Sequence, residues 1–483
     1  MLSVSGFYNR KMSLTLRLFT SGALGALLLC GSLGAAPAPA GHDWPTFDKD
    51  ARRSGASSDP TGITAANVAS MKRQQVNIDG TIDAAVIYLS GVQIRGAAHD
   101  AFFATTSYGK TLAIDAGSGS VLWTYTPPEY ASWEGSAQIT NATPVADPDR
   151  QHLYAASPDG HIQKLAIADG RAVWSTAITT LPSSEKITSS LTFANGHVIA
   201  ATGGYIGDAP PYQGHVAILD AASGRLDHVW NSLCSDRAGL LNPKACPESD
   251  SAIWGRSGAV VDPSTGHIFV ATGNGKWDGK TNWGDALIEL DAGATRILGN
   301  YTPADTERLD ETDADLGSTS PVLLGGGYLL QGGKDGHIRL LSEKSIAGTS
   351  PHRGGELQIV DTPSRVDLFT APAVFESGGV TWVFAADNAG TAAWTFQNGR
   401  LEPKWKNATG GTSPIVAGGL LYIYDPHGGL QVYEPTTGRK IATLPCGYGH
   451  WNSPIVADGR IALPEGNANS HHATGVLNIW RLP

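Results

Sequence analysis

Apolar and polar positions alternate along most of the chain, in short runs separated by turns rich in glycine and aspartate. A period of two residues is typical of β-strands that bury one face. One segment type recurs: a strand, a turn of the D-A-x-x-G kind, and a second strand that ends in tryptophan. It reads "TLAIDAGSGSVLWTY" at 111–125, "IQKLAIADGRAVWST" at 162–176 and "HVAILDAASGRLDHVW" at 215–230. Weaker copies begin at residues 286, 337, 391, 430 and 475, which makes eight copies.

A second hairpin precedes most of these copies, with a small-residue strand followed by a more apolar one. It spans 142–147, 258–273, 319–333, 371–387, 412–425 and 452–466. Two hairpins per repeat make a four-stranded antiparallel unit, which cannot bury both faces alone and must stack on its neighbours. The pattern therefore predicts an all-β fold, an eight-bladed β-propeller of four-stranded blades. We expect the N-terminal part of the mature chain to supply a strand to the last blade and close the ring.

Composition agrees with many short strands joined by tight turns. Of 483 residues, 59 are glycine and 13 tryptophan, only 16% are charged and only three are methionine. Glycine suits tight turns, whereas the residues that favour helices are scarce.

The first 40 residues read as a signal peptide. Arg10, Lys11 and Arg17 precede an apolar run, and Ala38 and Ala40 fit a cleavage site before residue 41. An uncleaved anchor is the alternative, although the run is shorter than the roughly 20 residues of a membrane span. The domains expected are thus a signal peptide at 1–40 and a single propeller at 41–483, without an integral membrane domain. The location expected is periplasmic or secreted.

The net charge of the chain limits the classes of molecule that it is expected to bind. The net charge is −10, and loss of the leader with its three basic and no acidic residues changes it to −13. An acidic chain lacks the basic footprint of a nucleic-acid-binding protein, so we expect no nucleic-acid partner.

Cysteine usage suits an oxidising compartment. Cys234 and Cys246 bracket a polar loop and are expected to form a disulfide, with two buried thiols as the alternative. Cys446 is then left as a core residue. The chain has no C-x-x-C-H motif, so no covalently attached haem is expected.

The D-A-x-x-G-x-x-x-W repeat resembles the PQQ (pyrroloquinoline quinone) repeat of quinoprotein-like propellers. The resemblance covers essentially the whole mature chain, including the opening "DWPTFDKDARRSG" at 43–55. In that family the repeat tryptophan docks on the next blade, which implies a structural role for Trp123, Trp174 and Trp230. The fold hosts both enzymes and scaffolds, so the resemblance is specific for architecture more than for function.

The stretch 251–291 is similar to the alcohol and polyvinyl-alcohol dehydrogenases of the family, in the order W…DP…GNG…W…GD. This similarity implies Trp254 at the floor of a PQQ pocket, Asn274 as a calcium ligand and Asp285 as calcium ligand and general base. The loop "YIGDAPPYQG" lacks the family's Glu, so Asp208 would replace it as a ligand of calcium and cofactor. The vicinal cysteine pair of many such alcohol dehydrogenases is absent from the sequence.

These roles are chemically reasonable. A flat quinone needs an aromatic face, calcium takes hard oxygen ligands, and an Asp can accept the proton of a substrate hydroxyl. Each residue also has a plain structural explanation. Trp254 can be blade packing, Asn274 a tight-turn residue, and Asp285 an Asx-turn.

Other polar segments are weaker candidates for a functional site. The acidic stretch 310–321 fits a cation loop or a solvated turn, and Lys334 falls in a K-D-G hairpin turn. His450 and Trp451 are candidates to face the central funnel.

Two functions therefore fit the chain. One is a PQQ- and calcium-dependent dehydrogenase acting on a small or polymeric alcohol. The other is a non-catalytic propeller that binds an envelope protein or a polymer, as does the outer-membrane assembly scaffold that shares the repeat.

Overall fold

The computed structural model describes residues 42–483. Of the two units into which the chain divides, the second spans Ala40–Pro483. The signal peptide predicted at 1–40 lies outside the described residues. Within the described residues, no helix is both long and apolar enough to cross a membrane.

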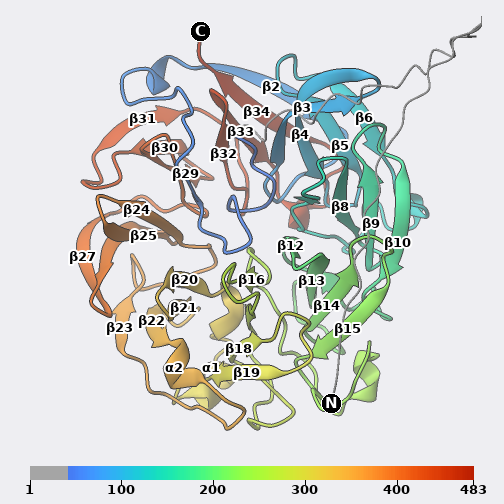
Figure 1. The fold of residues 1–483 in the computed structure, drawn as a ribbon, viewed down its shortest axis with the longest axis vertical. Coiled ribbons are helices and arrows are strands. Elements are labelled where there is room, and N and C mark those ends of the chain that lie inside the picture. Colours follow the sequence, from blue (N-terminus) through green and yellow to red (C-terminus); the bar gives the residue numbers. More distant parts are fainter. Residues whose placement is uncertain (1–41) are drawn as a thin grey trace, which may run out of the picture. The chain divides into compact units, whose positions relative to one another are not determined.

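The second unit consists of eight β-sheets arranged as a ring, in chain order from blue to red (Figure 1). This confirms the predicted eight-bladed propeller. The first four blades hold β3 Ile87–Ile94, β4 Ala97–Thr105, β5 Thr111–Asp115, β6 Val121–Tyr125; β7 Val145–Ala146, β8 His152–Ser157, β9 His161–Ala166, β10 Ala172–Ala177; β11 Lys186–Ile187, β12 Thr192–Ala194, β13 His197–Gly203, β14 His215–Asp220, β15 Leu226–Asn231; and β16 Val260–Val261, β17 Ile268–Ala271, β18 Leu287–Leu290, β19 Ile297–Tyr301.

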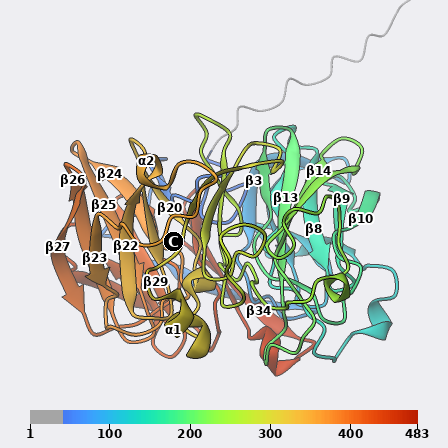
Figure 2. The same cartoon turned by 90° about the horizontal axis from the view of Figure 1, so that it is seen from below.

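The last four blades complete the ring, and each again places the more apolar hairpin strands in its middle. They hold β20 Val322–Gly325, β21 Tyr328–Gly332, β22 His337–Ser342, β23 Gln358–Asp361; β24 Ala373–Ser377, β25 Val380–Ala386, β26 Thr391–Gln397, β27 Arg400–Asn407; β28 Ile415–Ala417, β29 Leu420–Asp425, β30 Gly429–Tyr433, β31 Lys440–Leu444; and β32 Ile455–Ala457, β33 Arg460–Glu465, β34 Gly475–Arg481. Helices are few and short: α1 Thr306–Glu311, α2 Glu343–Ile346, and 3-10 turns at Val68–Ser70, Tyr130–Ser132, Pro243–Ala245, Leu316–Ser318 and Ala468–Ser470. Figure 2 shows the blades from the side.

The ring is closed by strands from both ends of the propeller. Strand β2, Lys72–Ile78, pairs antiparallel with β34 from Lys72↔Arg481 to Ile78↔Gly475. This confirms the predicted closure, and Figure 1 shows blue β2 beside red β34. Because the chain continues from β2 to β3 of the first blade, this pairing joins the last blade to the first.

Neighbouring blades are joined by the repeat tryptophans. Trp123 donates its indole N–H to the Ile167 carbonyl of the next blade at 2.8 Å and covers Gly170. Gly170 has φ +76°, and a Cβ there would lie 2.6 Å from the Trp123 ring. Trp174 covers Gly224 of the following blade in the same way. The turn glycine thus serves both the left-handed backbone and the close approach of the indole, which explains the D-A-x-x-G…W pattern.

The segment 43–57 crosses one end of the ring and includes β1, Ala56–Ser57, parallel to β28. Its carbonyls accept hydrogen bonds from the inner strands of four blades: Ala146 N to Pro45, Val261 N to Ala51, Val374 N to Ser54 and Val416 N to Gly55. The Arg53 side chain, 2% exposed, donates to the Leu191 carbonyl from within this segment. The segment thus packs across the inner strands at this end of the ring and leaves a cavity of about 490 Å³ beside it.

The predicted disulfide is also confirmed, whereas Cys446, expected to be a buried core residue, is only partly buried. Cys234 and Cys246 form a disulfide with a Cα–Cα distance of 6.2 Å. Cys446 is half-buried and unpaired within residues 42–483, and burial raises its thiol pKa to about 12. It packs against the core of the closing blade.

Candidate functional site

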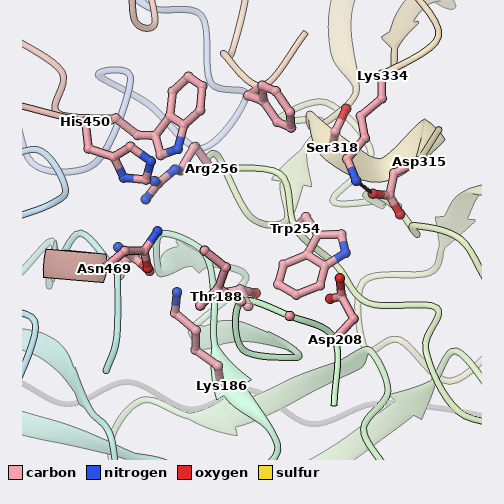
Figure 3. A pocket seen from close by; sticks show the side chains of 15 residues that line it. Lys186, Thr188, Asp208, Trp254, Arg256, Asp315, Ser318, Lys334, His450 and Asn469 are labelled. Carbon is pink, nitrogen blue, oxygen red and sulfur yellow. Dashed lines mark ion pairs between the residues drawn. The ribbon is translucent and has the colours of Figure 1, made fainter. Parts of the chain in front are cut away.

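A cavity of about 380 Å³ lies on the ring axis. Its walls come from the segments that precede the inner strands of several blades, so it opens at the end opposite 43–57. The residues that line it are Asn141, Lys186, Thr188, Ile206, Gly207, Asp208, Trp254, Arg256, Asp315, Ser318, Lys334, Phe369, His450, Trp451 and Asn469 (Figure 3). Its volume is within the range of small-molecule sites, roughly 300–1,000 Å³.

Trp254 is positioned by tight packing on its neighbours. Its ring meets Tyr212 edge to face at 6.1 Å. A Cβ on Gly273 would lie 2.9 Å from the Trp254 ring and 2.3 Å from Asp315 Oδ1, so only glycine fits between them. The G-N-G of the enlarged loop therefore allows the indole and a carboxylate to lie side by side at the pocket wall.

Asp315 and Lys334 form an ion pair at this wall. The Asp315 side chain is only 3% exposed, and its Oδ1 accepts the backbone N–H of Asn274 at 2.6 Å. Burial raises the pKa of Asp315, although Lys334 opposes the shift. Burial alone would lower the pKa of Lys334, but Asp315 and Asp313 outweigh it and raise that pKa. The pair places one proton acceptor beside one fixed cation.

The predicted base Asp285 lies just behind this wall. Its side chain is fully buried, and Oδ1 accepts the Leu316 N–H at 2.9 Å. Its other oxygen, Oδ2, has no partner among residues 42–483. Burial raises the pKa of Asp285 well above its ordinary value, and Asp315 and Asp310 reinforce the shift. Asp285 is not among the residues that line the cavity.

The other two predicted ligands are divided between the wall and the layer behind it. Asn274 is half-buried behind Asp315, and its carbonyl accepts the Ser251 N–H at 2.7 Å. Asp208 is exposed at the cavity edge, where Tyr212 donates its hydroxyl to Oδ1 at 3.3 Å. The structure thus brings Trp254 and Asp208 to the cavity and places Asn274 and Asp285 next to Asp315.

The rest of the enlarged loop stabilises itself. Asp278 Oδ1 accepts the backbone N–H groups of Lys280, Thr281 and Asn282 at 2.8–2.9 Å. Trp283 is 2% exposed and donates its indole N–H to Ser235 at 2.9 Å. The loop itself does not line the cavity, although Gly273 at its base packs against Trp254 and Asp315, which do. The tryptophans and Asp278 therefore account for its length structurally.

The opposite wall is cationic and comes from distant parts of the chain. Lys186 lies in β11 and Arg256 precedes β16, and both line the cavity. Figure 3 shows them on one side, with Asp208, Asp315 and Lys334 on the other and the Trp254 indole beside the acidic group. Burial lowers the pKa of Lys186 to about 7, with Arg256 contributing, and burial lowers that of Arg256.

Asp83 is the carboxylate of this wall and is fully buried. Its oxygens accept His450 Nδ1 at 2.8 Å, Ala468 N at 3.0 Å and Trp451 N at 3.2 Å, and Arg256 lies 3.7 Å away. His450 and Trp451 do face the funnel. Sequence reasoning missed this group because no short spacing links Asp83, Lys186, Arg256 and His450, whereas Lys334 was hidden in a turn motif.

One group of side chains in the described part of the chain is compact enough to hold a metal ion. One set of three His, Cys, Asp or Glu ligand atoms lies within 4.8 Å of one another, formed by Asp147, Asp149 and His152 near the start of β8. The cavity carboxylates Asp208 and Asp315 are outside that set. A cation beside them would need further oxygen donors, from amides, backbone or a bound cofactor.

Comparisons with known proteins agree with this architecture. Residues 59–239 match the family described as outer membrane protein assembly factor BamB. The dehydrogenase subunit of a quinone alcohol dehydrogenase from Acetobacter aceti is 22% identical over 78% of this chain and 59% of its own length. A polyvinylalcohol dehydrogenase from Pseudomonas sp. is 22% identical over 64% of this chain and 53% of its own.

The fold has close counterparts among solved structures. The quinohemoprotein alcohol dehydrogenase from Comamonas testosteroni has a TM-score of 0.67 at 17% identity, covering 91% of this chain and 81% of that one. The predicted resemblance to quinoprotein-like propellers is thereby confirmed. The chain spans little more than half the length of the two curated relatives, so their activities are not carried over to it directly.

Proposed function

We propose that this protein is a PQQ- and calcium-dependent dehydrogenase that oxidises an alcohol-type substrate in the axial cavity. The observation that carries the proposal is the buried Asp315–Lys334 pair beside the Trp254 indole, in a cavity of cofactor size. We further propose that residues 1–40 direct export to the periplasm or the medium and are removed, leaving the propeller at 41–483.

The residues present fit such a cofactor. The Trp254 indole offers a flat quinone an aromatic surface, and Asp208, Asn274 and Asp285 offer calcium hard oxygen donors. The unpartnered Asp285 Oδ2 is an oxygen that a cation would satisfy. When bound, PQQ accepts the substrate hydride and calcium polarises the quinone as a Lewis acid.

The chain itself supplies the proton acceptor and its orientation. We assign the acceptor role to Asp315, because it lines the cavity and its Oδ1 is held by Asn274 N. Lys334 fixes the carboxylate and compensates its charge. The assignment of the base to Asp285 stays a prediction, and its place behind the wall suits a role as ligand or support.

The test uses purified protein mixed with PQQ and calcium. Saturable quenching of tryptophan fluorescence, together with dye reduction on addition of simple alcohols, is the expected result. Trp254→Phe should weaken the quenching, whereas Trp382→Phe on strand β25 serves as control. Absence of both saturable quenching and dye reduction would overturn the dehydrogenase proposal.

A second function is favoured by the family match over residues 59–239. In that case the propeller is non-catalytic and binds an envelope protein or a polymer. The same titration separates the two, because a binding propeller has no need of saturable PQQ affinity.

A further inference from the structure

The two cation groups of the cavity differ in how their charge is compensated. Lys334 has two carboxylates, Asp313 at 3.0 Å and the paired Asp315. Among residues 42–483, Lys186 has neither an ion pair nor a hydrogen bond through its ammonium group. Its charged neighbours are Arg256, which repels it, and Asp83, which attracts it.

Asp83 cannot compensate both cations. It already accepts hydrogen bonds from His450, Trp451 N and Ala468 N and attracts Arg256. The wall thus carries two partly buried cations, Lys186 and Arg256, against one carboxylate that already accepts three hydrogen bonds. Charges of one sign that line a cavity attract a ligand of the opposite sign, so this wall favours an anion.

The surroundings are shaped for a planar anion. The Arg256 guanidinium lies over the Trp451 ring, 5.8 Å from its centroid, and Phe369 packs on the same indole at 5.1 Å. Stacking restricts the guanidinium, whose fork matches a carboxylate in two hydrogen bonds. Asn469 and Asn141 add amides to this end of the cavity.

We propose that Lys186 and Arg256 form a carboxylate-binding subsite at the end of the cavity opposite Asp315. The inference rests on the proposed function. The carboxylate belongs either to the cofactor, since PQQ is a tricarboxylate, or to a substrate that carries an acid group besides its hydroxyl. Both sources satisfy the same cations.

The test measures binding by calorimetry in wild type, Lys186→Gln and Lys186→Arg, with exposed Lys404→Gln as matched control. The ligands are PQQ with calcium, PQQ trimethyl ester with calcium, and benzene-1,3,5-tricarboxylate without calcium. We expect PQQ and the aromatic tricarboxylate to bind at least 10-fold more weakly to Lys186→Gln. The ester should not distinguish the variants, and Lys186→Arg should retain binding.

A kinetic arm separates the two sources. A PQQ affinity that is unchanged in Lys186→Gln, with KM for 6-hydroxyhexanoate raised at least 10-fold and that for 1,6-hexanediol unchanged, assigns the subsite to the substrate. If wild type binds the tricarboxylate but not PQQ, the dehydrogenase proposal falls and the subsite stands. If PQQ, the tricarboxylate and hydroxyhexanoate all fail to distinguish Lys186→Gln from wild type, the subsite is overturned.

Discussion

The acidic and cationic walls of the axial cavity are built on opposite principles. At the acidic wall, Asp315 has its own cation, Lys334, and a backbone donor, Asn274 N. At the cationic wall, Lys186 faces Arg256 and shares a carboxylate that is already saturated. At the acidic wall the charges compensate one another, so this wall is suited to act on a ligand. At the cationic wall positive charge is in excess, and an anionic ligand would compensate it.

The walls also differ in their origin along the chain. The acidic wall is drawn mainly from 273–334, where the repeat is interrupted by an enlarged loop and an acidic segment. The cationic wall joins Asp83 to His450, 367 residues away. The acidic wall could be predicted from one stretch of sequence, whereas the cationic wall forms only because the ring closes.

The largest expected effect falls on the acidic wall. Asp315→Asn should lower kcat at least about 100-fold, because a positioned general base contributes roughly 10²–10⁴-fold. Asn keeps the acceptor for Asn274 N, so the fold should survive. Asp361→Asn, an exposed carboxylate on strand β23, is the matched control and should leave kcat unchanged, as measured with an alcohol and an artificial dye. An unchanged kcat in Asp315→Asn would show that Asp315 is not the base.

Removal of Lys334 from the acidic wall should destabilise the protein. Lys334→Met leaves Asp315 buried without its partner, which costs roughly 3 kcal/mol of unfolding free energy. Urea unfolding at neutral pH measures it. The double variant Asp315→Asn with Lys334→Met should recover most of the loss, and failure to recover it would show that the pair is not the cause.

Removal of Lys186 from the cationic wall should instead stabilise the protein. In the ligand-free protein at pH 6, Lys186→Met should raise the unfolding free energy by roughly 1 kcal/mol, since it removes a partly buried cation that Arg256 repels. The folded-state pKa of Lys186, about 7, is below its ordinary 10.5, because of burial and Arg256, with Asp83 opposing. The cost in wild type is therefore complete below pH 7 and fades as pH rises toward 10.5.

The difference between Lys186→Met and wild type should consequently shrink from pH 7 to pH 10 in urea unfolding. A difference that stays constant with pH would contradict an uncompensated lysine. A loss of stability in the variant would show that Lys186 is already paired.

The smallest effect is expected at the rim. Ile206 is 72% exposed although it lines the cavity, so it offers apolar surface to an entering substrate. Ile206→Ser should raise KM for octanol about 2–5-fold relative to ethanol, given about 25 cal/mol per Å² of apolar surface. Val173→Ser, on strand β10 and 51% exposed, is the control and should leave the ratio unchanged.

Residues near one another in the sequence were placed well by pattern. The repeat predicted eight blades, the resemblance to quinoprotein-like propellers implied the docking of Trp123 on the next blade, and the spacing of two cysteines around a polar loop predicted the Cys234–Cys246 disulfide. Period, turn chemistry and loop closure all act over short distances. The stretch 251–291 pointed to one wall of the cavity, which Trp254 lines and behind which Asn274 lies. Pattern did not show that the acidic segment would bring Asp315, rather than Asp285, to the cavity surface.

The sequence by itself therefore determined the architecture, because each blade is a local unit repeated until the ring closes. The tertiary structure decided which side chains meet on the axis. Each blade offers one short segment to the centre, and no periodicity records how segments hundreds of residues apart combine their charges. Burial then made Asp315 a paired carboxylate and left Lys186 without a partner, a difference that depends on neighbours from other blades.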